Sequence, residues 1–217
     1  MRTLSDCRLY GILDLGYVEA LHVRRVADAM IEGGVDLIQL RGKAKSVDEL
    51  VDLAGELHEI TSSASIPLVV NDHAGVCQRV MVEGVHVGQN DDSITVAREK
   101  AGRAIIVGKS THSLDQARAA KAEGADYIGF GPIFATPTKP DYKPIGLDNI
   151  KQAHADVTLP IFCIGGIKID NLKQVIAAGA HRVAIVSGLL KASDITNYAR
   201  DVKRMLNSSF VIRHSSF

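Results

Sequence analysis

Cysteine is scarce in this chain, with three residues among 217: Cys7, Cys77 and Cys163. Their odd number and wide spacing argue against a disulfide framework and fit a protein of a reducing compartment. Cys163 lies within an apolar run, which favours a small core residue over a nucleophile, because free cysteine is among the most buried residue types. The sequence therefore indicates a cytoplasmic protein without disulfide bonds.

Long apolar runs and an excess of charge of one sign are also missing. Gly or charged residues interrupt every apolar stretch before it reaches the roughly 20 residues needed to span a membrane, and residues 1–7 lack the apolar run of a signal peptide. Lys plus Arg number 25 and Asp plus Glu number 25, so no field of one sign covers the chain. We expect a soluble protein that binds neither membranes nor nucleic acid, and any anion-binding site must be local.

The sequence instead alternates between short apolar runs and amphipathic segments. The runs read as continuous Val, Ile and Leu, which is typical of parallel strands covered on both faces. They span residues 9–13, 35–40, 67–70, 84–88, 104–108, 126–130, 160–164 and 182–186. Apolar residues at helical spacing are clearest at 46–61 and 170–178, and capping-box sequences begin at Ser46 and Ser113.

Eight strand–helix units fill the chain and leave no linker for a second domain. A (β/α)₈ barrel needs at least about 200 residues, which this chain provides. The alternative is an open, doubly wound sheet, but residues 11–16 lack the Gly-x-Gly-x-x-Gly loop that such folds carry after strand one. We therefore predict an α/β, single-domain (β/α)₈ TIM barrel over residues 1–206. Residues 207–217 are Ser-rich and aperiodic, and we expect a flexible C-terminal tail there.

Polar and glycine residues collect where the predicted strands end, and that end of a (β/α)₈ barrel carries the active site. Gly165-Gly166 and Ser187-Gly188 follow strands seven and eight, where barrels of this kind bind phosphate. Glycine lacks a Cβ, so backbone N–H groups there approach phosphate oxygens closely. Glycine also serves ordinary turns in barrel walls, so it is the position of the pairs that predicts a phosphate site.

Charged residues at the other strand ends predict a metal and a pyrophosphate site. Asp72 and Asp91 follow adjacent strands, and two carboxylates plus water and phosphate oxygens suit Mg²⁺. The alternative is that each caps the helix that follows, Asp91 in particular. Arg41, Lys43 and Lys139 carry the charge that a leaving pyrophosphate needs.

Two histidines, His73 and His112, also follow predicted strands. Each is a candidate acid–base group, and each is equally a candidate for a hydrogen-bonded structural residue.

Taken in order, these motifs resemble those of one enzyme family, the thiamine-phosphate synthases. The motifs are Gln39-x-Arg41-x-Lys43, Val70-Asn71-Asp72, His86-Val87-Gly88-Gln89-Asn90-Asp91, Gly129-Phe130-Gly131-Pro132-Ile133-Phe134 with Thr136-x-Thr138-Lys139, Ile164-Gly165-Gly166-Ile167 and Val186-Ser187. The likeness extends over residues 9–206. Together the motifs are specific, whereas any one of them alone would not be.

The resemblance implies a barrel that joins hydroxymethylpyrimidine pyrophosphate to a thiazole phosphate and releases pyrophosphate, with Mg²⁺ bound by Asp72 and Asp91. The implied catalytic residues are Arg41, Lys43, Ser110 and Lys139. The residues implied to hold the pyrimidine pyrophosphate are Gln39, Arg41, Lys43, Asn71 and Lys139, with Ser110 near the pyrophosphate. Those implied to hold the thiazole phosphate are Thr136, Thr138, Gly166, Val186 and Ser187. The implied partners are these two small molecules, and the oligomeric state stays open, a homo-oligomer included.

Two features depart from the family. An acidic residue commonly stands between the Arg and Lys of the first motif, where this chain has Gly42. We expect its absence to loosen the hold on Arg41 and Lys43. The C-terminal tail has no counterpart in the family.

Two other functions stay open. A thiazole tautomerase shares the barrel and the phosphate end, and Ser110-x-His112 resembles its catalytic-histidine region. Such an enzyme needs neither the two aspartates nor the Thr138-Lys139 pair, and this chain keeps all four, which favours the synthase. The second alternative is an inactive barrel that senses or binds a metabolite, which the intact metal ligands and pyrophosphate cations disfavour.

Overall fold

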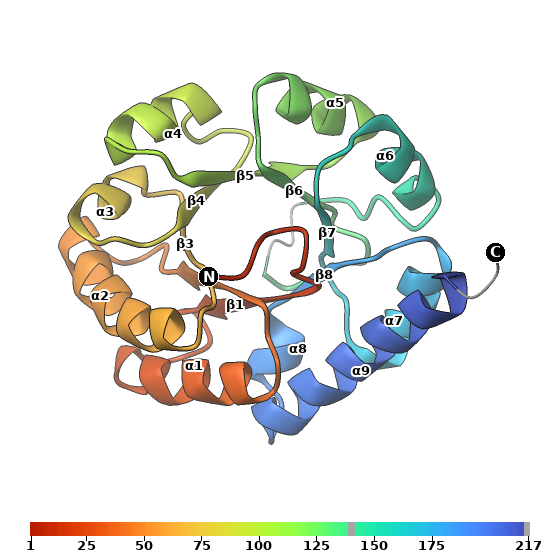
Figure 1. Cartoon of the computed structure of the whole chain (residues 1–217), viewed down its shortest axis with the longest axis horizontal. Coiled ribbons are helices and arrows are strands. Elements are labelled where there is room, and N and C mark those ends of the chain that lie inside the picture. Colours follow the sequence, from red (N-terminus) through yellow and green to blue (C-terminus); the bar gives the residue numbers. More distant parts are fainter. Residues whose placement is uncertain (139–141, 215–217) are drawn as a thin grey trace.

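The computed structural model describes residues 1–138 and 142–214, in which strands and helices alternate (Figure 1). The strands are β1 Leu9–Asp14, β2 Leu37–Arg41, β3 Leu68–Asn71, β4 Gly84–Val87, β5 Ile106–Thr111, β6 Tyr127–Phe130, β7 Ile161–Ile164 and β8 Val183–Ile185. The helices are η1 Ala20–His22, α1 Val23–Glu32, α2 Val47–Ser63, α3 Ala74–Arg79, α4 Ile94–Ala101, α5 Leu114–Ala122, α6 Ile150–Asp156, α7 Ile169–Ala177, α8 Ser187–Leu190 and α9 Ile195–His214. Every run predicted as a strand overlaps one, and the two clearest predicted helices are α2 and α7.

The strands form a closed parallel barrel in the order of the sequence. Leu9 of β1 lies opposite Val183 of β8, so the first and last strands complete the ring. Figure 1 looks down this ring and shows the helices around its outside. The predicted single-domain TIM barrel is therefore confirmed, and the open doubly wound sheet is excluded.

Buried side chains form two separate clusters. The larger cluster lies between the strands and the helices, as the continuous apolar strands predicted. The smaller cluster includes three aromatic residues, Tyr10, Tyr127 and Phe162, which pack edge to face with ring centroids 5.2–5.8 Å apart. They come from β1, β6 and β7, so the barrel interior is filled by side chains at this level.

The amino-terminal segment crosses one opening of the barrel, as Figure 1 shows. Asp36, 1% exposed, lies at this end and accepts hydrogen bonds from the backbone N–H groups of Arg8 (2.9 Å) and Leu9 (3.0 Å). It also pairs with the side chains of Arg2 and Lys203. A buried carboxylate needs such partners, and here they tie the start of the chain to α9.

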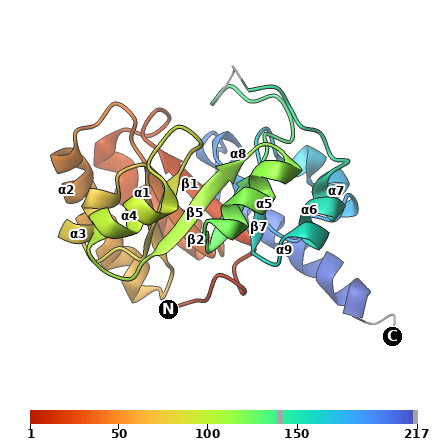
Figure 2. The ribbon, with the colours of Figure 1, turned by 90° about the horizontal axis from the view of Figure 1, so that it is seen from above.

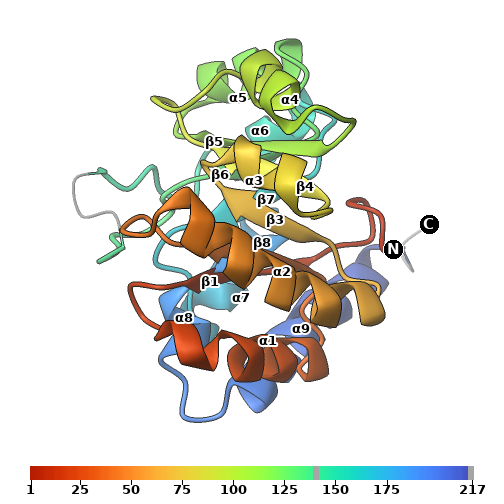
Figure 3. The ribbon, with the colours of Figure 1, turned by 90° about the vertical axis from the view of Figure 1, so that its left-hand side faces the viewer.

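The two openings of the barrel have different surroundings. Figures 2 and 3 place both chain termini at one end of the barrel and the connection between β6 and α6 at the other. In a parallel barrel all strands point the same way, so this second end is the one that collects the strand-end residues.

The three cysteines are core residues, as expected for Cys163. Cys7, Cys77 and Cys163 are buried and free, and burial raises the pKa of the Cys163 thiol to about 12, which fits a core residue.

Helix α9 crosses residue 207, where the predicted tail begins, and continues through His214. Extending an existing helix costs little compared with starting one, so Ser-rich composition did not end it. None of the helices among the described residues has the length and apolarity to cross a membrane.

Candidate active site

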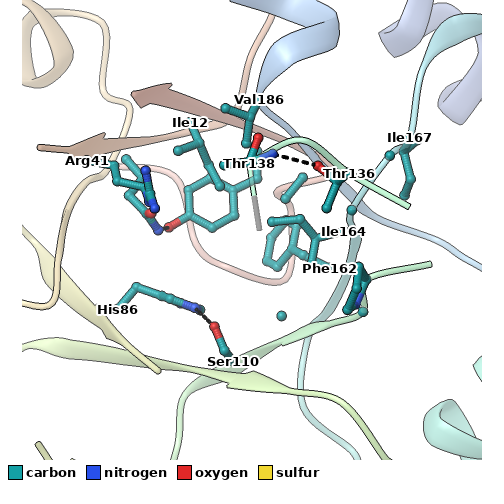
Figure 4. A pocket seen from close by; sticks show the side chains of 18 of the residues that line it. Ile12, Arg41, His86, Ser110, Thr136, Thr138, Phe162, Ile164, Ile167 and Val186 are labelled. Atoms are coloured by element: carbon teal, nitrogen blue, oxygen red, sulfur yellow. Dashed lines mark hydrogen bonds between the residues drawn. The ribbon is translucent and has the colours of Figure 1, made fainter. Parts of the chain in front are cut away.

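A pocket lies at the carboxyl ends of the strands (Figure 4), and the empty space in and around it, open solvent included, is about 910 Å³. The structure brings most of the predicted substrate-binding residues together in its wall: Gln39, Arg41, Asn71, Ser110, Thr136, Thr138, Gly166, Val186 and Ser187. Lys139 lies outside the described residues. The polar strand ends thus meet in one cavity, although they come from nearly every unit of the chain.

The two predicted metal ligands lie side by side. Burial raises the pKa of Asp72, and the neighbouring carboxyl of Asp91 raises it further. Lys43 offsets part of this effect, because its Nζ lies 3.7 Å from an oxygen of Asp72. Asp91 accepts a 2.7 Å hydrogen bond from the backbone N–H of Gly88, whereas Ser93 caps α4. The capping alternative for Asp91 is therefore not what the structure has.

This pair fits the coordination habits of Mg²⁺. The ion prefers hard oxygen ligands, commonly one or two carboxylates completed by water and substrate phosphate. A carboxylate whose pKa is raised by a neighbouring carboxyl is a favourable place for a cation. Asp72 also has a φ of 64°, an unusual backbone angle for a residue other than glycine, and such strain often marks functional sites. Within the described residues, no cluster of three or more His, Cys, Asp or Glu side chains competes as a metal site.

Arg41 has a partner that the sequence reasoning overlooked. Its guanidinium pairs with the carboxylate of Asp14, at the end of β1, whose side chain is 4% exposed. Asp14 also accepts a 2.9 Å hydrogen bond from the backbone N–H of Gly16, which fixes the carboxylate. For Arg41 the loosening expected from Gly42 is therefore not seen. Lys43 is more loosely held, since its side chain is half exposed.

The glycine pair after β7 is required by its backbone and its neighbours. Gly165 and Gly166 have φ angles of 96° and 65°, in the left-handed region that favours glycine. A Cβ on Gly166 would also lie 2.6 Å from the carbonyl oxygen of Ala135. Val186 and Ser187 line the same side of the pocket at the end of β8. The glycines thus let the turn after β7 pack against the segment that follows β6, and both segments line the pocket.

Two threonines of the connection after β6 join this wall. The backbone N–H of Thr138 lies 3.4 Å from the hydroxyl of Thr136, a contact visible in Figure 4. The hydroxyls of Thr138 and Tyr17 are 3.1 Å apart, and the ammonium of Lys191 lies 5.2 Å from the centre of the Tyr17 ring. Tyr17 and Lys191 are thus neighbours of the predicted phosphate end that no motif pointed to.

His112 lines the pocket and is anchored on two sides. Its Nδ1 donates to the carbonyl oxygen of Gly131, and its ring lies 4.6 Å from that of Tyr142, centre to centre. Its backbone N–H donates to the side chain of Gln116 at 2.7 Å, so Gln116 supports His112 rather than completing a capping box with Ser113. His112 is therefore a hydrogen-bonded structural residue that also lines the pocket.

Comparison with known proteins decides the family. A family model described as thiamine monophosphate synthase matches residues 9–189. The chain belongs to this family. A thiamine-phosphate synthase of Chloroflexus aurantiacus is 41% identical over 94% of both chains, and one of Natronomonas pharaonis is 42% identical over 88% of this chain and 90% of the relative. The solved thiamine phosphate pyrophosphorylase from Pyrococcus furiosus superposes with a TM-score of 0.87, at 29% identity over 95% of this chain and 98% of that one.

Three residues of this family member were not assigned a role from the sequence. Tyr10 and Tyr127 lie inside predicted strands, and His86 belongs to one of the motifs, but none of the three received a role from the sequence. All three are buried and hydrogen-bonded to one another or to pocket residues. The sequence did contain a signal for the two tyrosines: a tyrosine in a fully buried strand must find a hydrogen-bond partner for its hydroxyl.

Proposed function

We propose that this member of the thiamine monophosphate synthase family joins 4-amino-2-methyl-5-hydroxymethylpyrimidine pyrophosphate to a thiazole phosphate, with release of pyrophosphate and with Mg²⁺ as cofactor. The observation that carries the proposal is the placement of two features at the carboxyl ends of the strands. The Asp72–Asp91 pair, with Lys43 3.7 Å from Asp72, follows strands three and four, where Asn71 lines the pocket, and the glycine wall of the pocket lies at strands seven and eight. Such a site suits a pyrophosphate at one end and a phosphate monoester at the other.

The pyrimidine pyrophosphate is assigned to the half of the pocket formed by β2, β3 and β5. Gln39, Arg41 and Asn71 line this half, with Ser110 opposite. Lys43 and Lys139 are proposed as further cations for the pyrophosphate. Support comes from the Asp14 carboxylate, which holds the Arg41 guanidinium in place for bonds to phosphate oxygens.

The thiazole phosphate is assigned to the opposite half. The backbone around Gly166, with the side chains of Thr136, Thr138 and Ser187, supplies neutral hydrogen-bond donors to phosphate oxygens. The side chain of Val186 forms the adjacent apolar wall. This division leaves the two reacting groups facing each other across the cavity.

The chemistry follows from that placement. The bond between the exocyclic carbon of the pyrimidine and the pyrophosphate oxygen breaks, and both electrons leave with the oxygen. Arg41 and Lys43 stabilise the charge that grows on the leaving group, as bound Mg²⁺ would also do. The thiazole nitrogen then donates its lone pair to the pyrimidine carbocation and forms the new C–N bond. Ile12, Phe162 and Ile164 form an apolar wall that limits attack by water on the cation.

A second candidate function, thiazole tautomerisation, rests on His112. Its Nδ1 donates to Gly131, so the neutral ring has an unprotonated Nε2, and the residue lines the pocket. An imidazole in that state can accept a proton. The carboxylate pair would have no task in such a reaction, which is why the synthase is the favoured proposal.

The deciding experiment measures both reactions with the same protein. Coupling is followed by formation of thiamine phosphate from the two substrates, with Mg²⁺ and with excess chelator. Isomerisation is followed with the thiazole phosphate alone. Mg²⁺-dependent coupling supports the proposal, whereas isomerisation without any coupling would transfer the assignment to the tautomerase.

A further inference from the structure

A continuous chain of hydrogen bonds runs through the barrel interior from β2 to β5. The amide Nε2 of Gln39 donates to the hydroxyl of Tyr10, whose oxygen lies 2.9 Å from that of Tyr127. The Tyr127 hydroxyl lies 3.1 Å from Nδ1 of His86, and Nε2 of His86 lies 2.9 Å from the hydroxyl of Ser110. Figure 4 shows the last of these contacts at the edge of the pocket. Both end residues, Gln39 and Ser110, line the pocket.

The two tyrosines in the middle of the chain are held rigidly. Tyr10 is 2% exposed and Tyr127 is fully buried, and both rings pack edge to face against Phe162. Gly108 makes room for the second ring, because a Cβ there would lie 2.1 Å from Cζ of Tyr127. Burial raises the pKa of both phenols, so each hydroxyl keeps its proton. The two phenols are therefore neutral groups in fixed positions.

Because each hydroxyl has a single proton, one bond sets the direction of the next. Tyr10 accepts from Gln39, so its own proton points to Tyr127. The Tyr127 proton then points to Nδ1 of His86, which leaves the imidazole proton on Nε2, directed at Ser110. The Ser110 oxygen is thus an acceptor within the chain, and its proton is available to the pocket. At the other end, the Gln39 amide uses an N–H group on Tyr10 and turns its Oε1 acceptor away from that contact.

We propose that Tyr10 and Tyr127 are positioning residues that fix the polarity of both ends of this chain, so that Gln39 presents an acceptor and Ser110 a donor to the substrate ring. Resting on the proposed function, this gives the pyrimidine site a chemical preference. An exocyclic amine can donate to the Gln39 oxygen, and a ring nitrogen or a phosphate oxygen can accept from Ser110. An oxo group in place of the amine would set two acceptors against each other.

The same contacts also allow the reverse direction for every hydrogen bond in the chain. If Nδ1 of His86 carried the proton, Tyr127 would have to accept from it and donate to Tyr10. Gln39 would then offer its oxygen to Tyr10 and an N–H group to the pocket, and Ser110 would donate to His86. This reversed chain would favour the oxo analogue. The two arrangements differ in the tautomer of one histidine, which a spectrum reports.

The first measurement is ¹⁵N NMR of the histidine side chains, with the His86 signals assigned by comparison with a His86→Gln sample. The spectrum is taken at a pH above the range in which imidazole titrates. We expect the Nε2–H tautomer in the wild-type protein and a mixture of tautomers in Tyr127→Phe, which removes the hydroxyl and keeps the ring. An Nδ1–H tautomer in the wild type overturns the inference.

The second measurement is calorimetric binding of two unphosphorylated probes, 4-amino-5-hydroxymethyl-2-methylpyrimidine and its 4-oxo analogue. We expect the wild type to prefer the amino probe by at least about tenfold, the effect of one mispaired buried hydrogen bond. The preference should fall below about threefold in Tyr127→Phe and in Tyr10→Phe. Two tyrosine variants are used so that poor folding of one leaves the other. A wild type without preference, or tyrosine variants that keep it, overturns the inference.

A matched control removes a buried hydroxyl elsewhere. Thr61 is fully buried on α2, and its hydroxyl contacts the carbonyl oxygen of His58, far from the chain described above. Thr61→Val should keep the probe preference, and a loss there would assign the effect to general destabilisation and overturn the inference. The readouts also separate the two proposals. Probe preference without coupling activity contradicts the proposed function alone, and coupling without probe preference contradicts the polarity inference alone.

Discussion

The substitution Asp72→Asn should make the metal-free protein more stable and at the same time remove its response to Mg²⁺. The amide has nearly the shape of the carboxylate but no charge. In the folded protein Asp72 is largely buried beside Asp91, and both effects raise its pKa above the ordinary value of 3.8. Without a cation, ionisation of Asp72 is therefore opposed by its burial and by the neighbouring carboxyl, and Lys43 offsets only part of this cost.

The sign follows from proton binding. A raised pKa means that the folded state binds this proton more tightly than the unfolded state, so stability falls as pH rises from 3.8 through the folded pKa. At neutral pH the carboxyl group of Asp72 thus lowers the free energy of unfolding. Relieving such functional strain commonly gains about 0.5–2 kcal/mol. For a domain of this size, that gain raises Tm by about 2–4 °C per kcal/mol.

Metal binding supplies the second half of the prediction. Mg²⁺ at ten times its Kd stabilises the wild type by about 1.4 kcal/mol, or roughly 3–6 °C in Tm. The variant should show less than about a third of this increase. The measurement is the Tm by differential scanning calorimetry at neutral pH, with Mg²⁺ and with chelator.

Asp92→Asn is the matched control, because Asp92 is the neighbouring acidic residue and pairs with Lys100 at 2.8 Å near the surface. An exposed pair contributes at most about 1 kcal/mol, so this variant should be slightly less stable and should keep the full Mg²⁺ response. The reasoning is refuted if Asp72→Asn lowers Tm in chelator or leaves the Mg²⁺ increase unchanged.

Three further predictions concern the remaining parts of the site. Asp14→Asn leaves the Arg41 guanidinium without its buried partner and should lower the free energy of unfolding by about 3 kcal/mol, measured in urea, with an increase in KM for the pyrimidine pyrophosphate; an unchanged urea midpoint would contradict it. Ser187→Ala should raise KM for the thiazole phosphate about fivefold and leave kcat unchanged, since it removes one neutral hydrogen bond; a fall in kcat alone would show that the hydroxyl acts elsewhere. His112→Gln should keep coupling within about tenfold of wild type, because acid–base groups supply at least about 100-fold; a thousandfold loss would make His112 a catalytic acid or base.

Much of the fold was predictable because strands and helices of a parallel barrel have distinct patterns. Strands covered on both faces are continuous apolar runs, and these located all eight. Their carboxyl ends were placed too early at β1, β2, β3 and β5, where the strands continue to Asp14, Arg41, Asn71 and Thr111. A polar residue in sequence marks the start of a loop, whereas in the barrel these polar residues extend the strands: Arg41, Asn71 and Thr111 line the pocket, and Asp14 pairs with Arg41.

The candidate site was predictable for a related reason, and its gaps also have a physical cause. Parallel strands bring every carboxyl end to one face, so polar strand ends such as Gln39 and Ser110 had to meet. Residues that hold other site residues in place are harder to recognise in the sequence. No motif pointed to Asp14, and its role became visible only in its pairing with Arg41. Tyr10 resembled core, because the sequence does not tell which neighbour a buried hydroxyl will find.

Asp36 connects the two ends of the chain at one end of the barrel. Its donors include Arg2, from the start of the chain, and Lys203, from the last helix. Both ion pairs form only when both ends of the chain are folded onto the barrel. A half-barrel ending after β4 would contain Asp36 but lack Lys203, and would bury a carboxylate with fewer donors. The repetitive architecture should therefore not come apart unit by unit, as open solenoids do. This protein should unfold in one all-or-none transition, and shortening either end should weaken the barrel as a whole.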